Sequence, residues 1–372
     1  MALCAMMGTA TLTSCEGTLD DVFGEWSRPT KTEPTLSIEE TPFTFEAVEA
    51  GTIKVFFYND PTLLKPITYT KNGVSTSITA YTEITVAAGD VVSFSSENSS
   101  LYDGTGYIII QADHKCYVYG NMMSLINDEG DFSKDKTISG DYAFLYLLYA
   151  NKNIYNHPDK KLLLPATTLS QGCYYGLFYG CKALTKAPEL PATTLTQECY
   201  SDMFFNCPAL TTAPALPATT LAEDCYYEMF ERCTGLTTAP TLPATTLAEN
   251  CYYNMFRKCT GLTTAPALPA TTLAKQCYYC MFEGCTALET APVLPATTLV
   301  GQCYTGMFWN CSKLSSVSCK ATSEINSSNL SSWLEKAGTD ATSPTLHVTT
   351  GKESESWNLP TTPGTWTVKG DL

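Results

Sequence analysis

CYYEMFERCTGLTTAPTLPATTLAEN, residues 225–250, decides the fold, because almost the same sequence occurs before and after it. The prolines of its LPATTL hexapeptide recur every 26 residues, at Pro165, Pro191, Pro217, Pro243, Pro269 and Pro295. A fixed period of roughly 20 to 50 residues indicates supersecondary units that stack on one another. We therefore expect residues 164–319 to form a stack of six units.

Each unit has the same apolar positions. Counted from its first cysteine, these are positions 1, 2, 5, 6, 9 and 12, which in the quoted unit are Cys225, Tyr226, Met229, Phe230, Cys233 and Leu236. Steps of three and four are typical of one face of an α-helix. Thr246 and Glu249 have the spacing of a capping box, which predicts that the next helix starts there.

A short strand should follow each helix, around residues 236–239, and end at Pro240, because proline cannot donate to a strand ladder. Paired strands lie about 4.8 Å apart, whereas helices pack at roughly 8 to 10 Å. The stack should therefore curve with its strands inside. These expectations together predict an α/β solenoid, preceded by an all-β sandwich domain.

The repeated cysteines occupy positions 1 and 9. Such cysteines could form disulfides, bind a metal, act as reactive thiols or simply pack in the core. Two cysteines eight residues apart on a helix would be about 12 Å apart, and a disulfide needs Cα atoms within about 6.8 Å. Zinc does not fit this spacing, and all three histidines, His114, His157 and His347, lie outside the units. A nucleophilic thiol needs a base or a cation nearby, and neither accompanies the cysteines from unit to unit.

Buried thiols that act as small hydrophobic side chains are the remaining interpretation. The structural core that follows from it contains Cys173, Cys181, Cys225, Phe230, Cys233 and Leu236. Cys280 replaces a polar residue at an outward position, so we expect it to be exposed.

The run F-x-x-C-x-x-L, here Phe230, Cys233 and Leu236, resembles the BspA-like leucine-rich repeats of Bacteroidetes surface proteins. The resemblance covers about residues 140–320. It implies a leucine-rich-repeat solenoid at the cell surface and adhesion to host extracellular-matrix proteins. The chain departs from the family in its longer unit and in having Ala239 and Pro240 where the family's strand is rich in valine and isoleucine.

The N-terminal residues 1–15 are mostly apolar and end in Leu-Thr-Ser-Cys, which resembles a bacterial lipobox. The resemblance implies that Cys15 is lipidated and that the segment before it is a signal peptide. A secretory segment is this short, whereas a spanning helix needs about 20 apolar residues. Residues 16–35 then form a tether, and the expected location is the outer membrane, exposed on the cell surface.

Three further segments flank the repeats. Residues 36–130 contain short alternating runs with turn residues, such as Asn72-Gly73, and predict a β-sandwich. Residues 131–163 form an irregular coil, in which Phe144 precedes its equivalent Tyr174 by 30 residues instead of 26, and it should cap the stack and join it to the sandwich. Residues 320–372 break the period; we expect a C-terminal cap with a short helix at 329–337 and buried tryptophans.

The composition limits the partners. A net charge of −15 argues against nucleic acid, whose phosphates need clusters of lysine and arginine. It also argues against electrostatic adhesion to anionic lipid, so any membrane contact should come from the lipid anchor. No catalytic constellation appears at motif spacing, and we expect a protein that is not an enzyme and needs no cofactor.

The expected function is therefore binding. Position 7 of the units varies and supplies the candidate contact residues, which are Tyr179, Phe205, Glu231, Arg257, Glu283 and Trp309. Such variation fits either partner specificity or a lack of constraint. The leading hypothesis is a lipid-anchored adhesion protein that presents its solenoid to a protein partner such as the host matrix. The alternatives are glycan binding through the β-sandwich, and a structural spacer in a surface assembly.

Overall fold

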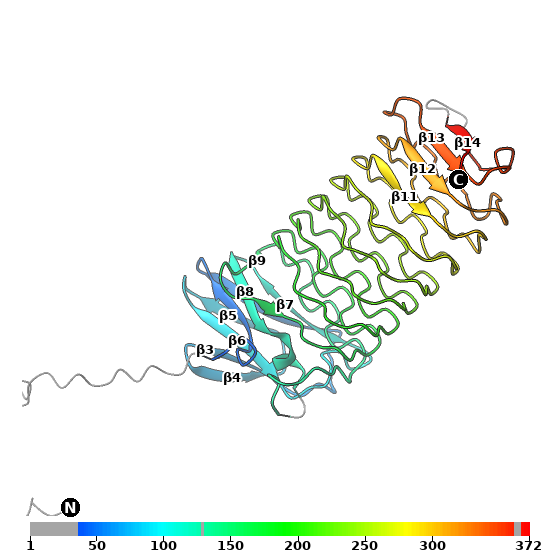
Figure 1. The fold of residues 1–372 in the computed structure, drawn as a ribbon. Helices are drawn as coiled ribbons and strands as arrows, with labels where there is room; N and C mark the ends of the chain where they lie inside the picture. The colour runs from blue at the N-terminus through cyan, green and yellow to red at the C-terminus, as the bar shows by residue number, and fades with distance from the viewer. Residues whose placement is uncertain (1–35, 128–129, 361–365) are drawn as a thin grey trace, which may run out of the picture. The chain divides into compact units, whose positions relative to one another are not determined.

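The computed structural model describes residues 36–127, 130–360 and 366–372. Cys15, residues 1–15 and the tether 16–35 lie outside the described residues. Residues 37–372 form one compact unit, which is rich in strands (Figure 1). Within the described ranges the only helix is a single 3₁₀ turn, η1 at Met122–Leu125, so no helix is long enough to cross a membrane.

The N-terminal strands form two sheets. They are β1 Phe43–Ala47, β2 Gly51–Tyr58, β3 Ile67–Lys71, β4 Val74–Ile78, β5 Thr82–Val86, β6 Val91–Ser96, β7 Tyr107–Ala112 and β8 Cys116–Asn121. One sheet has the order β8-β1-β6-β3-β4, and the other has the order β5-β2-β7; every pair in them is antiparallel. Alternating residues such as Ile53 and Val55 are fully buried.

The predicted Asn-Gly hairpin is confirmed. Asn72 and Gly73 join β3 to β4 with φ values of 50° and 77°. Two consecutive residues with positive φ give a turn whose twist matches that of the flanking strands, and asparagine and glycine tolerate that conformation best. The local sequence therefore determined this part of the β domain.

Residues 131–163 connect the β domain to the repeats. β9, Ile154–Asn156, and β10, Leu162–Leu163, both pair in parallel with β8. The same segment supplies a first layer for the repeats, because the Phe144 amide donates to the Cys173 carbonyl at 2.9 Å and its ring stacks on Tyr174. The core of buried residues is continuous from the β domain into the repeats.

The predicted α-helices of the repeats are wrong. In the quoted unit, amides at even positions donate to the next unit, as Tyr226 does to Cys251 (3.2 Å) and Phe230 to Met255 (3.0 Å). Amides at odd positions close turns within the unit, as Met229 does to Tyr226 (3.3 Å). This segment is a chain of four-residue turns, and it pairs with both neighbouring units.

The left-handed backbone conformation at positions 0, 4 and 8 makes these turns possible. In the quoted unit, Asp224, Glu228 and Arg232 have φ values of 53°, 51° and 62°. Glycine, asparagine and aspartate adopt this conformation most readily. They fill most of these positions, namely Gly172, Gly176, Gly180, Asp202, Asn206, Asp224, Asn250, Asn254, Gly284, Gly306 and Asn310.

This composition was the sequence feature that the helical interpretation overlooked. Apolar residues at positions 1, 5 and 9 and at 2 and 6 repeat every four residues, which over nine residues cannot be distinguished from a helical stripe. Two consecutive positions face inward and the next two face outward. The turn residues at positions 0, 4 and 8 distinguish the two structures.

The predicted capping box is also wrong, because no helix follows it. The threonines of the LPATTL segments instead form parallel bridges between units, as Thr220 does with Thr246. The expected strands after the cysteine segment are mostly single bridges, such as Thr238 to Thr264. Among the first five units a longer strand appears only in the fifth, at β11 Thr290–Leu294, where Pro292 lies at a register shift.

Aromatic ladders form the centre of the repeat stack. The position 2 tyrosines stack from unit to unit with ring centroids 5.7 to 6.0 Å apart, from Tyr174 to Tyr304. The position 6 phenylalanines stack at 5.3 to 5.7 Å, from Phe178 to Phe308. The predicted curvature depended on packed helices, and the described repeat units contain no helix.

All cysteines in the described residues are free and buried. The six core residues expected from the sequence, Cys173, Cys181, Cys225, Phe230, Cys233 and Leu236, have no exposed surface. The position 9 thiols also donate to a carbonyl of the preceding unit, as Cys233 Sγ does to Phe204 O at 3.1 Å. The expectation for Cys280 is wrong: this residue is 7% exposed, because Gly306 of the next unit packs against its sulfur.

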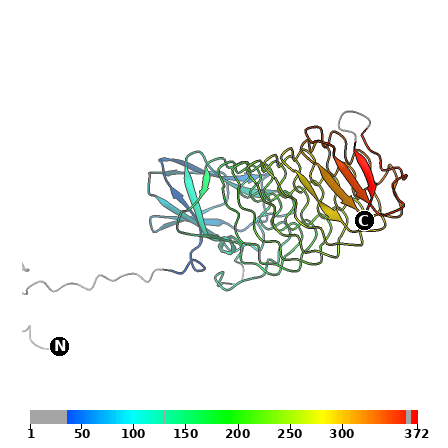
Figure 2. The same cartoon turned by 45° about the horizontal axis from the view of Figure 1, so that its top comes forward.

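The C-terminal segment continues the parallel sheet. β11, β12 (Ser316–Cys319), β13 (Thr345–Val348) and β14 (Thr367–Gly370) lie side by side, coloured yellow to red in Figures 1 and 2. The short helix predicted at 329–337 is absent, and turns replace it. Trp333, Trp357 and Trp366 are buried, and the Trp333 indole donates to Trp357 O at 2.7 Å.

We predict that the turn conformation can be tested by a pair of substitutions at Asn310, an exposed residue with φ of 60°. Asn310→Ala should be less stable than Asn310→Gly by about 1 kcal/mol, because only glycine adopts this φ without steric cost. An α-helix would reverse the order by a similar amount. The free energy of unfolding from urea titration decides between them.

A second prediction concerns the twelve repeat thiols. Burial raises their pKa values, to about 12 for Cys207 and Cys251, so very little thiolate forms at neutral pH. Iodoacetamide should leave these thiols unlabelled in the native chain and label them all in denaturant. Peptide mass spectrometry scores each cysteine separately, and labelling of the repeat thiols without denaturant would contradict this packing.

Candidate functional site

The position 7 residues lie on the turn side of the stack, but they are not equally accessible. Tyr179, Phe205, Arg257 and Glu283 are half-buried, and Trp309 is 38% exposed. The remaining residue of the row, Glu231, is only 2% exposed, so the expectation that it faces outward is wrong. Its carboxylate pairs with Arg232 of its own unit at 3.3 Å and with Arg257 of the next unit at 3.0 Å, and these ion pairs hold it against the stack.

Six aromatic rings form a continuous line that crosses from the β domain onto the repeats. We call Tyr58, Tyr107, Tyr146, Tyr149, Tyr179 and Phe205 the aromatic stripe. Successive ring centroids in this order are 5.0, 6.0, 5.4, 5.1 and 4.5 Å apart. Tyr58 ends β2 and Tyr107 begins β7, and the other four rings come from turns of successive units. None of the six is fully buried.

Two glycines make room for the tyrosines of this region. A Cβ atom on Gly176 would lie 2.3 Å from the Tyr146 ring, and a Cβ on Gly172 would lie 2.3 Å from the Tyr142 ring. Both glycines also have left-handed φ, near 55°. The Tyr142 hydroxyl donates to Glu198 at 2.6 Å. The stripe therefore lies directly on the backbone of the first unit.

An ion network continues the row beyond Phe205. Arg257 binds Glu283 at 2.7 Å and Glu231 at 3.0 Å. Burial raises the pKa of Glu231, with the charge of Glu228 acting in the same direction and Arg257 opposing. The Arg232 guanidinium lies 5.9 Å from the centre of the Phe205 ring. The network has more carboxylates than cations.

Asp202 is the most perturbed acid of this face. It is 7% exposed and has a φ of 56°. Burial, followed by the charge of Glu228, raises the pKa of Asp202 to about 7, while the Tyr175 hydroxyl opposes the shift. Within the described residues, Asp202 Oδ1 and Glu231 Oε2 are buried without a hydrogen-bond partner. Two unsatisfied carboxylate oxygens therefore lie in one acidic cluster.

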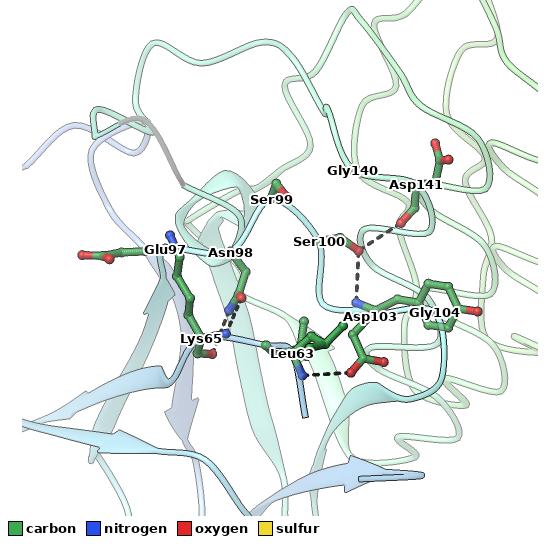
Figure 3. A pocket seen from close by; sticks show the side chains of 12 residues that line it. Leu63, Lys65, Glu97, Asn98, Ser99, Ser100, Asp103, Gly104, Gly140 and Asp141 are labelled. Atoms are coloured by element: carbon green, nitrogen blue, oxygen red, sulfur yellow. Dashed lines mark hydrogen bonds between the residues drawn. The ribbon is translucent and has the colours of Figure 1, made fainter. Parts of the chain in front are cut away.

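A separate hollow of about 500 Å³ lies beside the loops around Ser99 and Asp103 (Figure 3). Several of its polar groups bind one another. The Ser100 hydroxyl donates to the Asp141 carbonyl at 3.0 Å, and Asp103 accepts the Leu63 amide at 3.1 Å. Backbone amides, with that of Gly106 first, hold the pKa of Asp103 well below its usual range. These contacts fix the loops around the hollow.

Metal chemistry finds no support in the residues that the structure describes, because no group of three potential ligand side chains is close enough to hold an ion. His114 contacts Asp113 and Cys116, but these three do not form such a group.

The chain has no match among known proteins: no family model, no curated protein and no solved structure matches it.

Sequence reasoning found part of this face and missed the rest. It selected Tyr179 and Phe205 by their variation, but it missed Tyr146 because the first layer does not keep the 26-residue period. It also missed Asp202, although aspartate at a turn position was a usable indication of left-handed φ. Tyr58 and Tyr107 join the stripe through the packing of β2 and β7, which no local pattern reveals.

The raised pKa of Asp202 predicts a pH-dependent stability. The folded state holds this proton up to a pH of about 7, whereas an unfolded chain loses it near 3.8. Stability should therefore fall as the pH rises through this window, by up to about 4 kcal/mol. Asp202→Asn cannot ionise and should lose less stability between about pH 4 and pH 8. Urea titrations at several pH values test this, with Asp340→Asn on the surface as control. Parallel curves for wild type and Asp202→Asn would refute the assignment.

Proposed function

We propose that this chain is a lipid-anchored binding protein of a bacterial cell surface, and that its repeats form a leucine-rich-repeat-like solenoid which presents the aromatic stripe to a protein partner. The observation that carries the proposal is the stripe itself. Its six rings touch in sequence, lie outside the repeat core and extend from the β domain onto three successive layers of the stack.

Tyrosine-rich surfaces suit protein recognition. A tyrosine supplies a large contact area with only two side-chain torsions to fix, and its hydroxyl can bind a polar group at the same time. Interfaces are accordingly enriched in aromatic residues, which often act as energetic centres. In this chain the rings are already held by their neighbours, so binding would order few side chains.

Glycan binding is supported less well, because a sugar ring stacks on the face of an aromatic ring. Tyr149 and Tyr179 are stacked with an interplanar angle of 25°, and Tyr179 and Phe205 with an angle of 9°. Their faces are therefore covered by each other, and mainly their edges and hydroxyl groups are available. The role of a structural spacer would leave the stripe without a purpose.

The test is binding of the purified full chain to a panel of immobilised extracellular-matrix proteins and to a glycan array. We expect retention on at least one protein and about a tenfold loss of affinity for the variant Tyr149→Ser/Tyr179→Ser. Tyr81→Ser, an exposed tyrosine outside the stripe, is the matched control. Binding to glycans alone, or equal binding by both variants, would refute the proposal.

A further inference from the structure

The surroundings of the aromatic stripe are acidic. The charge of Asp202 contributes to the raised pKa values of Tyr146, Tyr175 and Tyr179, in each case after burial, which is the larger cause. Glu228 acts in the same way on Tyr179 and on Tyr227. The backbone places these acids beside the stripe: the Phe205 amide donates to the Asp202 carbonyl at 2.9 Å, and Glu228 has the equivalent position in the next unit.

The cations of this face do not neutralise those two carboxyl groups. Arg257 makes a bidentate contact with Glu283, through Nε and Nη2, and uses Nη1 for Glu231. Arg232 pairs with Glu231 at 3.3 Å. Both arginines are therefore committed to Glu231 and Glu283, and Glu228 accepts a hydrogen bond from the neutral amide of Asn254 at 3.0 Å.

We infer that the partner segment bound at the stripe is basic, and that lysine or arginine side chains of the partner contact the tyrosines and Glu228 and lie close to the buried Asp202. This inference rests on the proposed function. Charge complementarity supports it, because a cation near these rings gains an attraction to the carboxyl groups and can donate a hydrogen bond to an exposed phenol oxygen.

The unsatisfied oxygens support the same ligand chemistry. Asp202 and Glu231 are each more than nine-tenths buried, and each has one carboxylate oxygen without a partner in the described ranges. A buried carboxylate without a counter-ion is costly. A positive charge brought close by a partner would reduce that cost and favour the ionised form of Asp202, whereas an anion would increase it.

The chain already contains this combination of groups within its own fold. In the β domain, Lys160 Nζ lies 4.1 Å from the centre of the Tyr119 ring and 2.8 Å from Glu46 Oε2. The arrangement lowers the pKa of Glu46, with the Lys160 hydrogen bond as the largest cause. At the stripe, tyrosines and carboxyl groups also lie near one another, and the nearby Arg232 pairs with Glu231 instead of Asp202 or Glu228.

Other partner classes fit less well. The chain carries a net charge of −15, which repels nucleic acid and anionic lipid headgroups at a distance. The same charge attracts a basic protein segment and should accelerate its association at low ionic strength.

The experiment uses the full chain and three synthetic peptides that differ only in charge: alternating lysine and serine, glutamine and serine, and glutamate and serine. Fluorescence anisotropy measures each affinity at low and at physiological salt. We expect binding of the lysine peptide alone, with an affinity that falls about tenfold or more as salt is added. Equal binding of the glutamine peptide would overturn the inference.

Two double variants locate the effect. Asp202→Asn/Glu228→Gln should weaken the lysine peptide about tenfold. Glu189→Gln/Glu289→Gln removes the same charge from exposed residues on the strand side and should leave the affinity within about twofold. Urea titration confirms that both variants are folded. An equal loss in both variants would show that net charge alone is responsible, and would overturn the inference.

The two proposals fail in different ways. If matrix binding depends on Tyr149 and Tyr179 but the lysine peptide does not bind, the basic partner is wrong and the binding function stands. If the lysine peptide binds at Asp202 and Glu228 but no matrix protein is retained, the acidic face is supported as a site for cations and the adhesion proposal fails.

Discussion

The repeat region depends on one constraint, the alternation of its backbone hydrogen bonds. Amides at even positions of the turn segment reach the next unit, while amides at odd positions close turns within their own unit. A backbone segment without this pairing would bury many unsatisfied polar groups, which is energetically prohibitive. The alternation requires a left-handed residue every fourth position, so the choice of glycine, asparagine or aspartate there is a backbone requirement rather than a surface preference.

That pairing fixes the register of every unit on the next, and the side chains follow. Equivalent tyrosines and phenylalanines stack nearly in parallel because their backbones are 26 residues apart and hydrogen-bonded. The position 9 thiols occupy a place where a small side chain must also donate to a carbonyl of the preceding unit. A cysteine satisfies both conditions. The six identical cysteine pairs thus have a packing role that does not need disulfides, metal or thiolate chemistry.

The same register controls the outward positions, where the residues are not identical. In an isolated unit the position 7 residue would be a single surface side chain. In the stack, the position 7 residues of successive units contact one another: the rings of Tyr179 and Phe205 stack, and Arg257 forms ion pairs. Acids on the same face lose contact with solvent without always satisfying both carboxylate oxygens, as Asp202 does. This is the physical origin of the acidic, aromatic face on which both proposals rest.

The sequence by itself determined the period, the inward positions, the burial expected of the repeated cysteines and the Asn-Gly hairpin, because each depends on local pattern or turn chemistry. It did not distinguish turns from helices, since residues recurring every four positions fit both over so short a segment. Only the tertiary structure decided that Tyr58 and Tyr107 join Tyr146, that Glu231 is buried and that Cys280 is covered by Gly306. Those facts arise from contacts between units and between domains, and no single unit contains the information.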